Sequence, residues 1–182
     1  RRKLVLLALH QPGLNLLLLR RTLPELRENH LVPLLSELGK AVDYNGTERV
    51  FRFPTGSRLR LGYCDKEGDV YQYQGQEYDV IGLEEATHFT EEQMQFLTTC
   101  NRTVKAGFKP RMYYTCNPGG PGHGWVKRLF IDRRYQPGEE PSEYAFIPAR
   151  IWDNPVLLQG DPGYVKQLQA LPEDLRRAYL DG

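Results

Sequence analysis

Hydrophobic residues along the chain form two kinds of pattern, and the two kinds alternate. Short continuous apolar runs, which are typical of strands buried on both faces, occupy residues 14–20, 79–83 and 111–116. Between these runs, apolar residues recur at the spacing of a helix, most clearly over residues 23–38. Strands that alternate with helices are typical of an α/β fold, so the pattern predicts a mostly parallel sheet flanked by helices.

Helix-breaking residues mark the ends of the first two predicted helices. An N-terminal helix should stop at Pro12 and Gly13. The helix over residues 23–38 should bend at Pro33, because proline lacks a backbone N–H, and should close at Gly39. These two helices therefore flank the first buried strand.

The remaining elements are predicted from shorter signals. Thr90 and Gln93 form a capping box, so a helix should begin just after Thr90. Two apolar segments joined by Pro-Thr-Gly-Ser at residues 54–57 predict a β-hairpin inserted into the sheet. Later patterns predict a helix at residues 125–130, a strand at 143–152 and a short helical tail at about 161–182. Because no repeat or low-complexity linker interrupts the chain, we expect residues 1–182 to form one domain.

Composition narrows the function classes only slightly. The 24 Lys and Arg against 23 Asp and Glu leave a formal net charge of +1, so any surface that binds nucleic acid must be local. Cys64, Cys100 and Cys116 are far apart and form no CxxC pair, which argues against a zinc site or a disulfide framework and favours a reducing, intracellular setting. The apolar runs are much shorter than the roughly 20 residues that cross a bilayer, so no membrane segment is expected.

Two adjacent carboxylates, Glu84 and Glu85, follow the buried strand at residues 79–83. In open α/β sheets, ligands bind beyond the carboxyl ends of the strands, so the pair should lie at the functional edge. One carboxylate can bind Mg²⁺ while the other polarises a water molecule. The alternative is a solvated strand end, which two acids alone do not exclude.

A second polar strand end occurs at Asn117, after the strand at residues 111–116. Its amide can donate to a phosphate oxygen or hold an attacking water, as a polar residue does in this place in ATPases of the additional-strand, catalytic-glutamate class. Pro118 stops the strand, so the side chain should stay at the edge. The alternative is that Asn-Pro-Gly-Gly is only a turn, which those residues favour by themselves.

Together these segments resemble the ATPase domain of phage terminase large subunits over nearly the whole chain. The resemblance lies in "LLLLRRTLPELRENH", "YDVIGLEEATHFTEEQ", "YYTCNPGGPGHGWVKRLF" and "IWDNPVLLQGDPGYVKQLQALPEDLRRAYLDG", in this order. It implies a P-loop NTPase fold of the additional-strand, catalytic-glutamate type that uses ATP and Mg²⁺. By the same resemblance Glu84 takes the metal-binding place of the Walker B motif and Glu85 that of the catalytic base, while Thr115, Cys116 and Asn117 form the motif that couples hydrolysis to DNA movement.

The resemblance also implies partners and a location. Terminase large subunits package double-stranded DNA into procapsids, with a portal protein and a terminase small subunit, and they work as homo-oligomeric rings in the cytoplasm of an infected or prophage-carrying bacterial host. Two alternatives stay open: another nucleic-acid translocase or helicase-like ATPase, and a non-catalytic DNA- or protein-binding module that keeps the fold.

One motif of the family does not occur in the 182 residues. No G-x-x-x-x-G-K-[ST] phosphate-binding loop is present, and the first helix corresponds to the helix that follows that loop. We therefore expect the 182 residues by themselves to bind ATP weakly and to hydrolyse it negligibly. The chain ends near the point where the nuclease domain of the family would begin, so we expect no DNA cleavage from it.

Four arginines are weaker candidates for the site. Arg20 and Arg21 end the first buried strand and could contact phosphate or DNA, although arginines at a strand end are often simply solvated. Ring ATPases commonly use an arginine finger from a neighbouring subunit. Arg58 and Arg60 are candidates for it, and their alternation with leucines places both on one strand face, for which solvation is the slightly favoured alternative.

Overall fold

The computed structural model describes residues 1–180 of the chain. The chain divides into two compact units, residues 1–116 and 117–182, and each is described by itself. None of the helices in the described part of the chain combines the length and hydropathy that a membrane span requires.

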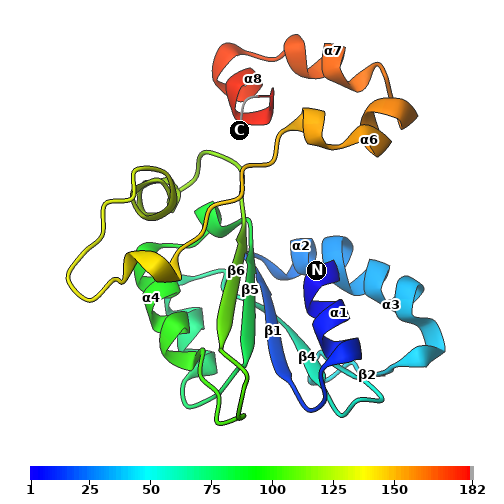
Figure 1. The fold of residues 1–182 in the computed structure, drawn as a ribbon. Coiled ribbons are helices and arrows are strands. Elements are labelled where there is room, and N and C mark those ends of the chain that lie inside the picture. Colours follow the sequence, from blue (N-terminus) through cyan, green and yellow to red (C-terminus); the bar gives the residue numbers. More distant parts are fainter. Residues whose placement is uncertain (181–182) are drawn as a thin grey trace. The chain divides into compact units, whose positions relative to one another are not determined.

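The first unit is built on a six-stranded sheet in the order β2-β3-β4-β1-β5-β6 (Figure 1). Strands β4, β1, β5 and β6 run parallel to one another, while β2 and β3 are antiparallel additions at one side. This arrangement confirms the predicted mostly parallel α/β sheet. The strands are β1 (Asn15–Arg20), β2 (Asp43–Asn45), β3 (Val50–Arg52), β4 (Arg58–Tyr63), β5 (Val80–Glu84) and β6 (Arg111–Thr115).

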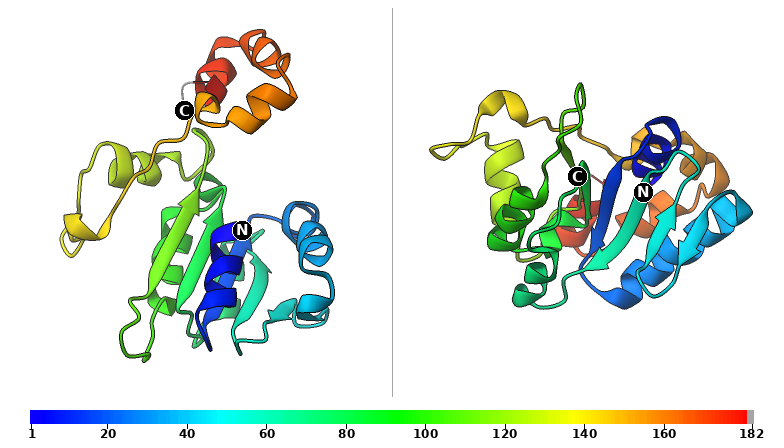
Figure 2. Two further views of the ribbon diagram at one scale, coloured as in Figure 1. Left: turned by 45° about the vertical axis from the view of Figure 1, so that its right-hand side comes forward. Right: turned by 90° about the horizontal axis from the view of Figure 1, so that it is seen from below.

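Helices cover both faces of this sheet. Helices α1 and α3 lie on one face, and α4 lies on the other (Figure 2). Leu16 and Leu18 of β1 pack in the core cluster with Leu4 of α1 and Leu34 of α3. Because both faces are covered, the four central residues of β1 are all buried, which explains its unbroken apolar run. The helical segments of this unit are α1 (Arg2–His10), α2 (Leu23–Leu26), a π-helical turn (Arg27–Leu31), α3 (Val32–Leu38), α4 (Glu91–Cys100) and 3₁₀ turns at Gly39–Ala41, Glu67–Tyr73 and Ala86–His88.

The predicted hairpin is present, and it forms part of the main sheet. Strands β3 and β4 pair antiparallel, and the turn between them is closed by a hydrogen bond from Phe53 N to Ser57 O at 2.9 Å. Gly56 in this turn has φ 80°, a conformation that glycine adopts without strain. Strand β4 also pairs along its length with β1, so the hairpin extends the parallel sheet instead of standing apart from it.

The helix predicted over residues 23–38 continues through Pro33, with a π-helical turn just before it. The proline ring nitrogen cannot donate to the carbonyl of Asn29, four residues earlier. In the structure Arg1 Nη1 donates to that carbonyl at 2.9 Å, and the N–H of Val32 reaches back five residues to Arg27 O. The helix closes at Gly39, which has φ 50°, as predicted.

The capping box at the start of α4 is confirmed. Gln93 N donates to Thr90 Oγ1 at 3.3 Å, and Thr90 N donates to Gln93 Oε1 at 3.2 Å. These two bonds satisfy backbone donors that a helix N-terminus otherwise leaves without partners. Helix α4 therefore begins at Glu91, one residue after the predicted cap.

The second unit is helical, and the strand predicted at residues 143–152 is wrong. This segment is mostly exposed, it joins no ladder in the described part of the chain, and Pro148 interrupts it with a residue that cannot donate a ladder hydrogen bond. The helical tail begins earlier than predicted, at Pro155, where Asn154 caps the helix, and residues 181–182 of the predicted tail lie outside the described residues. The helical segments are α5 (His123–Val126), a π-helical turn (Lys127–Ile131), 3₁₀ turns at Pro141–Glu143 and Ile151–Asp153, α6 (Pro155–Gly160), α7 (Tyr164–Gln169) and α8 (Glu173–Leu180).

Candidate functional site

The carboxyl ends of the parallel strands bring several polar side chains to one edge of the sheet. Arg20 ends β1, Glu84 ends β5 and Thr115 ends β6, and the register pairs Glu84 with Thr115. Strand β5 lies between β1 and β6. The edge position that the sequence predicted for the two acids is therefore confirmed.

The second acid, Glu85, has a left-handed backbone conformation that sets the direction of its side chain. Glu85 has φ 53° and ψ 57°, which is uncommon for a residue other than glycine. Along a regular strand, the side chains of Glu84 and Glu85 would point to opposite faces of the sheet. The left-handed turn ends the strand and starts the 3₁₀ turn at Ala86–His88, which His88 N closes by donating to Glu85 O at 2.8 Å. Such backbone strain costs on the order of 1–3 kcal/mol and is common at functional sites.

Glu84 is held by a cation and a histidine through one of its two oxygens. Arg20 Nη1 donates to Glu84 Oε2 at 2.7 Å, and His30 Nε2 makes a short hydrogen bond to the same oxygen. Burial alone would raise the pKa of Glu84, but the hydrogen bond from His30 and the charge of Arg20 outweigh it and hold that pKa below its ordinary value. Glu84 is therefore ionised at neutral pH.

His30 is a site residue that sequence reasoning missed. Its place on the apolar side of the helix over residues 23–38 predicted only that it faces the core, and its side chain is 2% exposed. Its partner Glu84 is 54 residues away in the sequence. A histidine among leucines on a buried helix face was the available signal, but periodicity alone names no partner.

Arg20 and Arg21 both contact protein groups at this edge. In addition to Glu84, Arg20 lies near the carboxylates of Glu25 at 3.7 Å and Glu85 at 3.9 Å. Arg21 Nη1 donates to Gln93 Oε1 at 2.8 Å, which links β1 to the capped end of α4. Contact of either arginine with phosphate or DNA stays a prediction.

The three predicted coupling residues fall on either side of the boundary between the two units. Thr115 and Cys116 end the first unit, and Asn117 begins the second. Glycines with positive φ follow at positions 119 and 120, and Gly119 N donates to His123 Nδ1 at 3.1 Å. The chain bends at Pro118 and Gly120, but the backbone hydrogen bond of a turn comes only after them, from His123 N to Gly120 O at 3.2 Å. A coupling role for Thr115, Cys116 and Asn117 stays a prediction.

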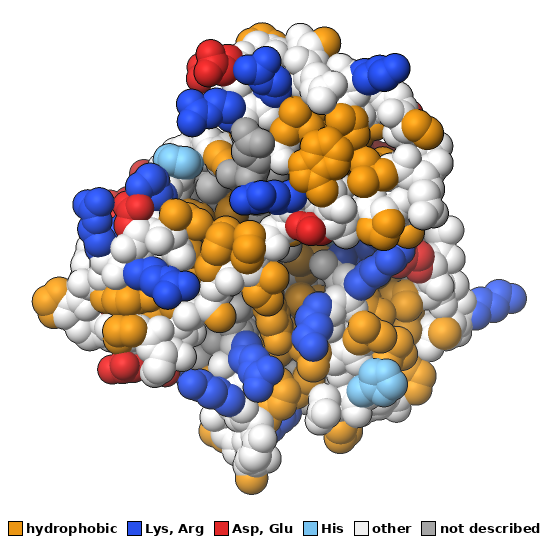
Figure 3. All heavy atoms as spheres, turned by 45° about the horizontal axis from the view of Figure 1, so that its top comes forward, with side chains coloured by type: hydrophobic (Ala, Val, Ile, Leu, Met, Phe, Trp, Pro, Cys, Tyr) orange, Lys and Arg blue, Asp and Glu red, His pale blue; other side chains and the backbone are white. Residues whose placement is uncertain are grey.

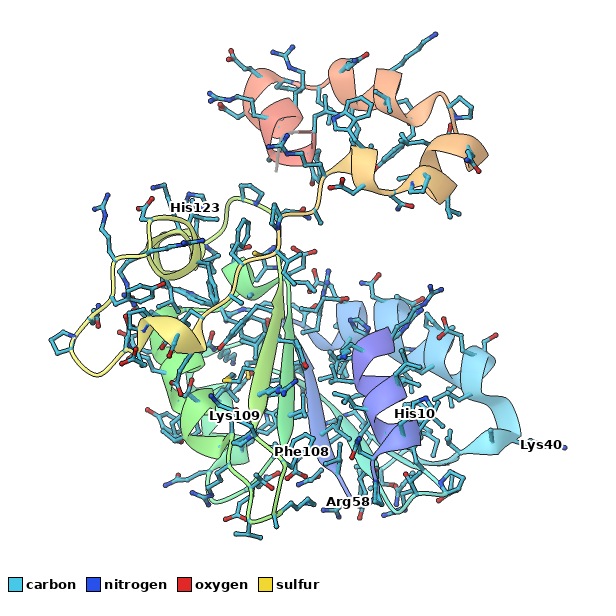
Figure 4. All side chains as sticks on the ribbon, viewed as in Figure 1. His10, Lys40, Arg58, Phe108, Lys109 and His123 are labelled. Carbon is cyan, nitrogen blue, oxygen red and sulfur yellow. The ribbon has the colours of Figure 1, made fainter. Side chains whose placement is uncertain are left out.

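Arg58 and Arg60 have different surroundings. Arg60 Nη1 donates to Gln76 Oε1 at 2.5 Å and to Tyr78 Oη at 3.2 Å, and its guanidinium lies 5.3 Å from the centre of the Tyr73 ring. The expectation of a solvated strand face is therefore wrong for Arg60. Arg58 is exposed at the amino end of β4, the opposite edge from Glu84 (Figure 4), and a role as arginine finger stays a prediction for it.

The residues at the carboxyl edge fit a magnesium ion that phosphate oxygens help to hold. Within residues 1–180, no three His, Cys, Asp or Glu side chains gather into a metal site. Mg²⁺ commonly needs only one or two carboxylates, because it keeps waters and binds substrate phosphates. Glu84 meets this need, since Oε1 accepts no hydrogen bond from any described residue.

The sheet order, the two covered faces and the polar carboxyl edge define a P-loop NTPase-like α/β fold. The sequence profile of the family described as phage terminase large subunit matches residues 2–182. The chain therefore belongs to the phage terminase large subunit family. No curated protein sequence matches the chain.

Solved structures of similar fold include two viral terminases. The large terminase from a thermophilic bacteriophage, in complex with ADP, has a TM-score of 0.72 and 19% identity, over 95% of this chain and 41% of that one. The complex of the same terminase with ATP-γ-S has a TM-score of 0.71 and 20% identity, over 98% of this chain and 42% of that one. The ATPase domain of the Thermus phage P74-26 large terminase has a TM-score of 0.56 and 15% identity, over 98% of this chain and 79% of that one. This chain thus spans less than half of the first of these proteins, and the likeness shows the fold.

Proposed function

We propose that the chain is the ATPase part of a viral DNA-packaging motor. One observation carries the proposal: Glu84 and Glu85 meet at the carboxyl edge of a central parallel strand, where Glu84 keeps one free carboxylate oxygen and Glu85 is turned by a strained backbone. Family membership supports the same proposal, as do the complexes of the thermophilic bacteriophage terminase with ADP and ATP-γ-S.

The two acids have different roles in the proposed reaction. Mg²⁺, when bound, neutralises the negative charge of phosphate oxygens, and Glu84 would hold it. Glu85 accepts a proton from the attacking water and orients that water toward the phosphate. Phosphoryl transfer needs positioning and charge stabilisation more than covalent help. The two carboxylates would supply a metal ligand and a base for such a reaction. Asn117 would hold the water or a phosphate oxygen.

DNA, portal protein, small subunit and a homo-oligomeric ring in the host cytoplasm belong to the same proposal. The support is family membership, since the surface by itself is not diagnostic. On the face that Figure 3 shows, Lys and Arg side chains are interspersed with hydrophobic and uncharged ones, so the described residues there form no continuous basic patch. This distribution agrees with the formal net charge of +1.

Replacement of the Glu85 carboxylate by an amide tests the proposal. In the full-length protein, Glu85→Gln should lower ATP turnover by about 10²–10⁴-fold, because the amide cannot accept the proton, while the Kd for ATP changes little. Glu92→Gln is the matched control, since Glu92 is an exposed acid seven positions further along the chain and should not alter turnover. Steady-state ATP hydrolysis and fluorescent nucleotide titration measure the two quantities.

Two results would count against the proposal. Equal turnover in wild-type and Glu85→Gln protein would remove the role given to Glu85. Tight nucleotide binding without any turnover in the wild-type protein would favour the non-catalytic binding module.

A further inference from the structure

His30 lies in the π-helical turn that precedes Pro33. This turn shifts the register of the helix and presents the His30 side chain to the end of β5. The carbonyl of Asn29, to which Pro33 cannot donate, accepts a hydrogen bond from Arg1 Nη1 at 2.9 Å. Single π-helical turns of this kind are often found at functional sites.

The His30 ring makes one hydrogen bond although it is buried. Its Nε2 contacts Glu84 Oε2, and its Nδ1 is buried with no hydrogen-bond partner among the described residues. An ionised carboxylate can only accept, so Nε2 carries the proton and donates it. Leaving the other ring nitrogen without a partner is unfavourable, and a leucine in this place would avoid that loss. The contact with Glu84 is therefore the feature of His30 that packing does not explain.

The contact with His30 also decides which carboxylate oxygen of Glu84 is free. Arg20 Nη1 and His30 Nε2 share Oε2, and Arg20 Nη2, beside Nη1, donates to no described residue. Guanidinium and carboxylate groups readily form a two-point pair that uses both oxygens. Without His30, the carboxylate can rotate so that Arg20 Nη1 and Nη2 each donate to one of its oxygens. His30 opposes this rotation and keeps Oε1 available.

We propose that His30 is a positioning residue, which orients Glu84 so that Oε1 stays free and could hold the cation of a bound nucleotide. The inference rests on the proposed function, because it takes Glu84 as the residue that holds Mg²⁺. His30 itself touches neither nucleotide nor metal in this role. It acts as the hydrogen-bond partners of metal ligands do in other proteins, where they fix the direction of the ligand.

The test compares two replacements of His30 in the full-length protein. Gln places an amide N–H close to the position of the imidazole Nε2–H, whereas Leu fills similar space and offers no donor. The measurement is binding of a fluorescent ADP analogue over a series of Mg²⁺ concentrations, which needs no hydrolysis. Leu34→Ala is the control for packing, because Leu34 is fully buried one helical turn further along on the same side.

We expect His30→Leu to raise the Mg²⁺ concentration for half-maximal tightening of ADP binding by about 10- to 100-fold, as for other partners of metal ligands. Binding without Mg²⁺ should be unchanged, and His30→Gln should stay close to wild type. Leu34→Ala should lower the unfolding temperature without altering the Mg²⁺ requirement.

Three results would overturn the inference alone and leave the proposed function standing: a wild-type Mg²⁺ requirement in His30→Leu, equal shifts in His30→Leu and His30→Gln, or an equal shift in Leu34→Ala. If Mg²⁺ does not strengthen ADP binding to the wild-type protein, the proposed function fails and this inference fails with it.

Discussion

The two ends of β5 carry acids whose surroundings are opposite in kind. At the amino end, Asp79 uses both carboxylate oxygens: Asn15 N donates at 2.7 Å, Lys105 Nζ lies at 2.8 Å, and Thr103 Oγ1 makes a further short hydrogen bond. At the carboxyl end, the partners of Glu84 share one oxygen. A fully satisfied buried carboxylate stabilises the fold, whereas a half-satisfied one at a strand end is available for a ligand.

This contrast predicts that Asp79→Asn destabilises the protein without touching the candidate site. Asp79 is 2% exposed, and the amide cannot accept all the bonds that the carboxylate accepts. We expect the free energy of unfolding at pH 7, from urea titration, to fall by about 1–3 kcal/mol. Asp65→Asn is the matched control, because Asp65 is exposed; equal losses in the two variants would contradict the structural role of Asp79.

The loss of stability in Asp79→Asn should depend on pH. Burial would raise the pKa of Asp79, but the hydrogen bonds from Asn15, Lys105 and Thr103 hold it below its ordinary value. A folded-state pKa below the unfolded one stabilises the fold fully above the unfolded value, near 4, and this contribution is lost as the pH falls through the folded value. The difference in unfolding free energy between wild type and Asp79→Asn should therefore be constant at neutral pH and shrink below about pH 4. A difference that grows on acidification would contradict the assignment.

At this scale, sequence reasoning found positions but not partners. The place of Glu84 and Glu85 followed from one apolar run and the rule that parallel strands end at a common edge. The partner of Glu84 could not be predicted, because His30 reaches it only through the π-helical turn before Pro33. The engagement of Arg60 was missed for a similar reason, since Gln76 and Tyr78 come from the segment after a 3₁₀ turn whose course the pattern does not specify.

Among the secondary-structure elements, the predictions that were right depended on local chemistry or on burial from both sides. The capping box at Thr90 and the four consecutive buried leucines of β1 are examples. The strand predicted at residues 143–152 failed because a strand needs a neighbouring edge, and this exposed segment has none in the described structure. Strand β2 was missed because it is only three residues long, contains no apolar run and lies at the sheet edge.

Close packing between elements gives a sharper prediction at Gly62 in β4. A Cβ atom there would lie 2.2 Å from Tyr73 Oη and 2.9 Å from a methyl group of Leu19 in β1. Because Tyr73 is fully buried and cannot move aside freely, Gly62→Ala should lower the free energy of unfolding by about 1–3 kcal/mol.

Gly68 provides the matched control for this prediction, since a Cβ atom there meets nothing within 4 Å. Gly68→Ala should therefore be neutral or slightly stabilising in the same urea titration. If both alanine variants unfold at the same urea concentration, close packing of Gly62 against Tyr73 is not what requires glycine.

At the scale of the whole molecule, the proposed ring would let an arginine finger come from a neighbouring copy of the chain, and Arg58 is the candidate. Arg58 is exposed, its side chain makes no hydrogen bond or ion pair with the described residues, and it lies at the amino end of β4. Glu84 and Glu85 lie at the carboxyl edge, so the five residue steps of a six-residue strand, about 17 Å at 3.3 Å per step, separate Arg58 from them along the sheet. Arg58 therefore cannot serve the acids of its own chain, and a role as an arginine finger requires a neighbouring subunit.

Mixing two inactive variants of the full-length protein tests this role. Arg58→Ala should lower ATP turnover by about 10³–10⁵-fold, the usual effect of losing an arginine finger. Mixed with Glu85→Gln subunits, it should regain turnover, because some interfaces then combine an intact Arg58 with an intact Glu85. Arg111→Ala is the control, since Arg111 is an exposed arginine at the amino end of the nearby strand β6 and should keep wild-type turnover. If the mixture assembles, as checked by light scattering, and stays as inactive as its parents, Arg58 is not the finger and the missing positive charge comes from another residue.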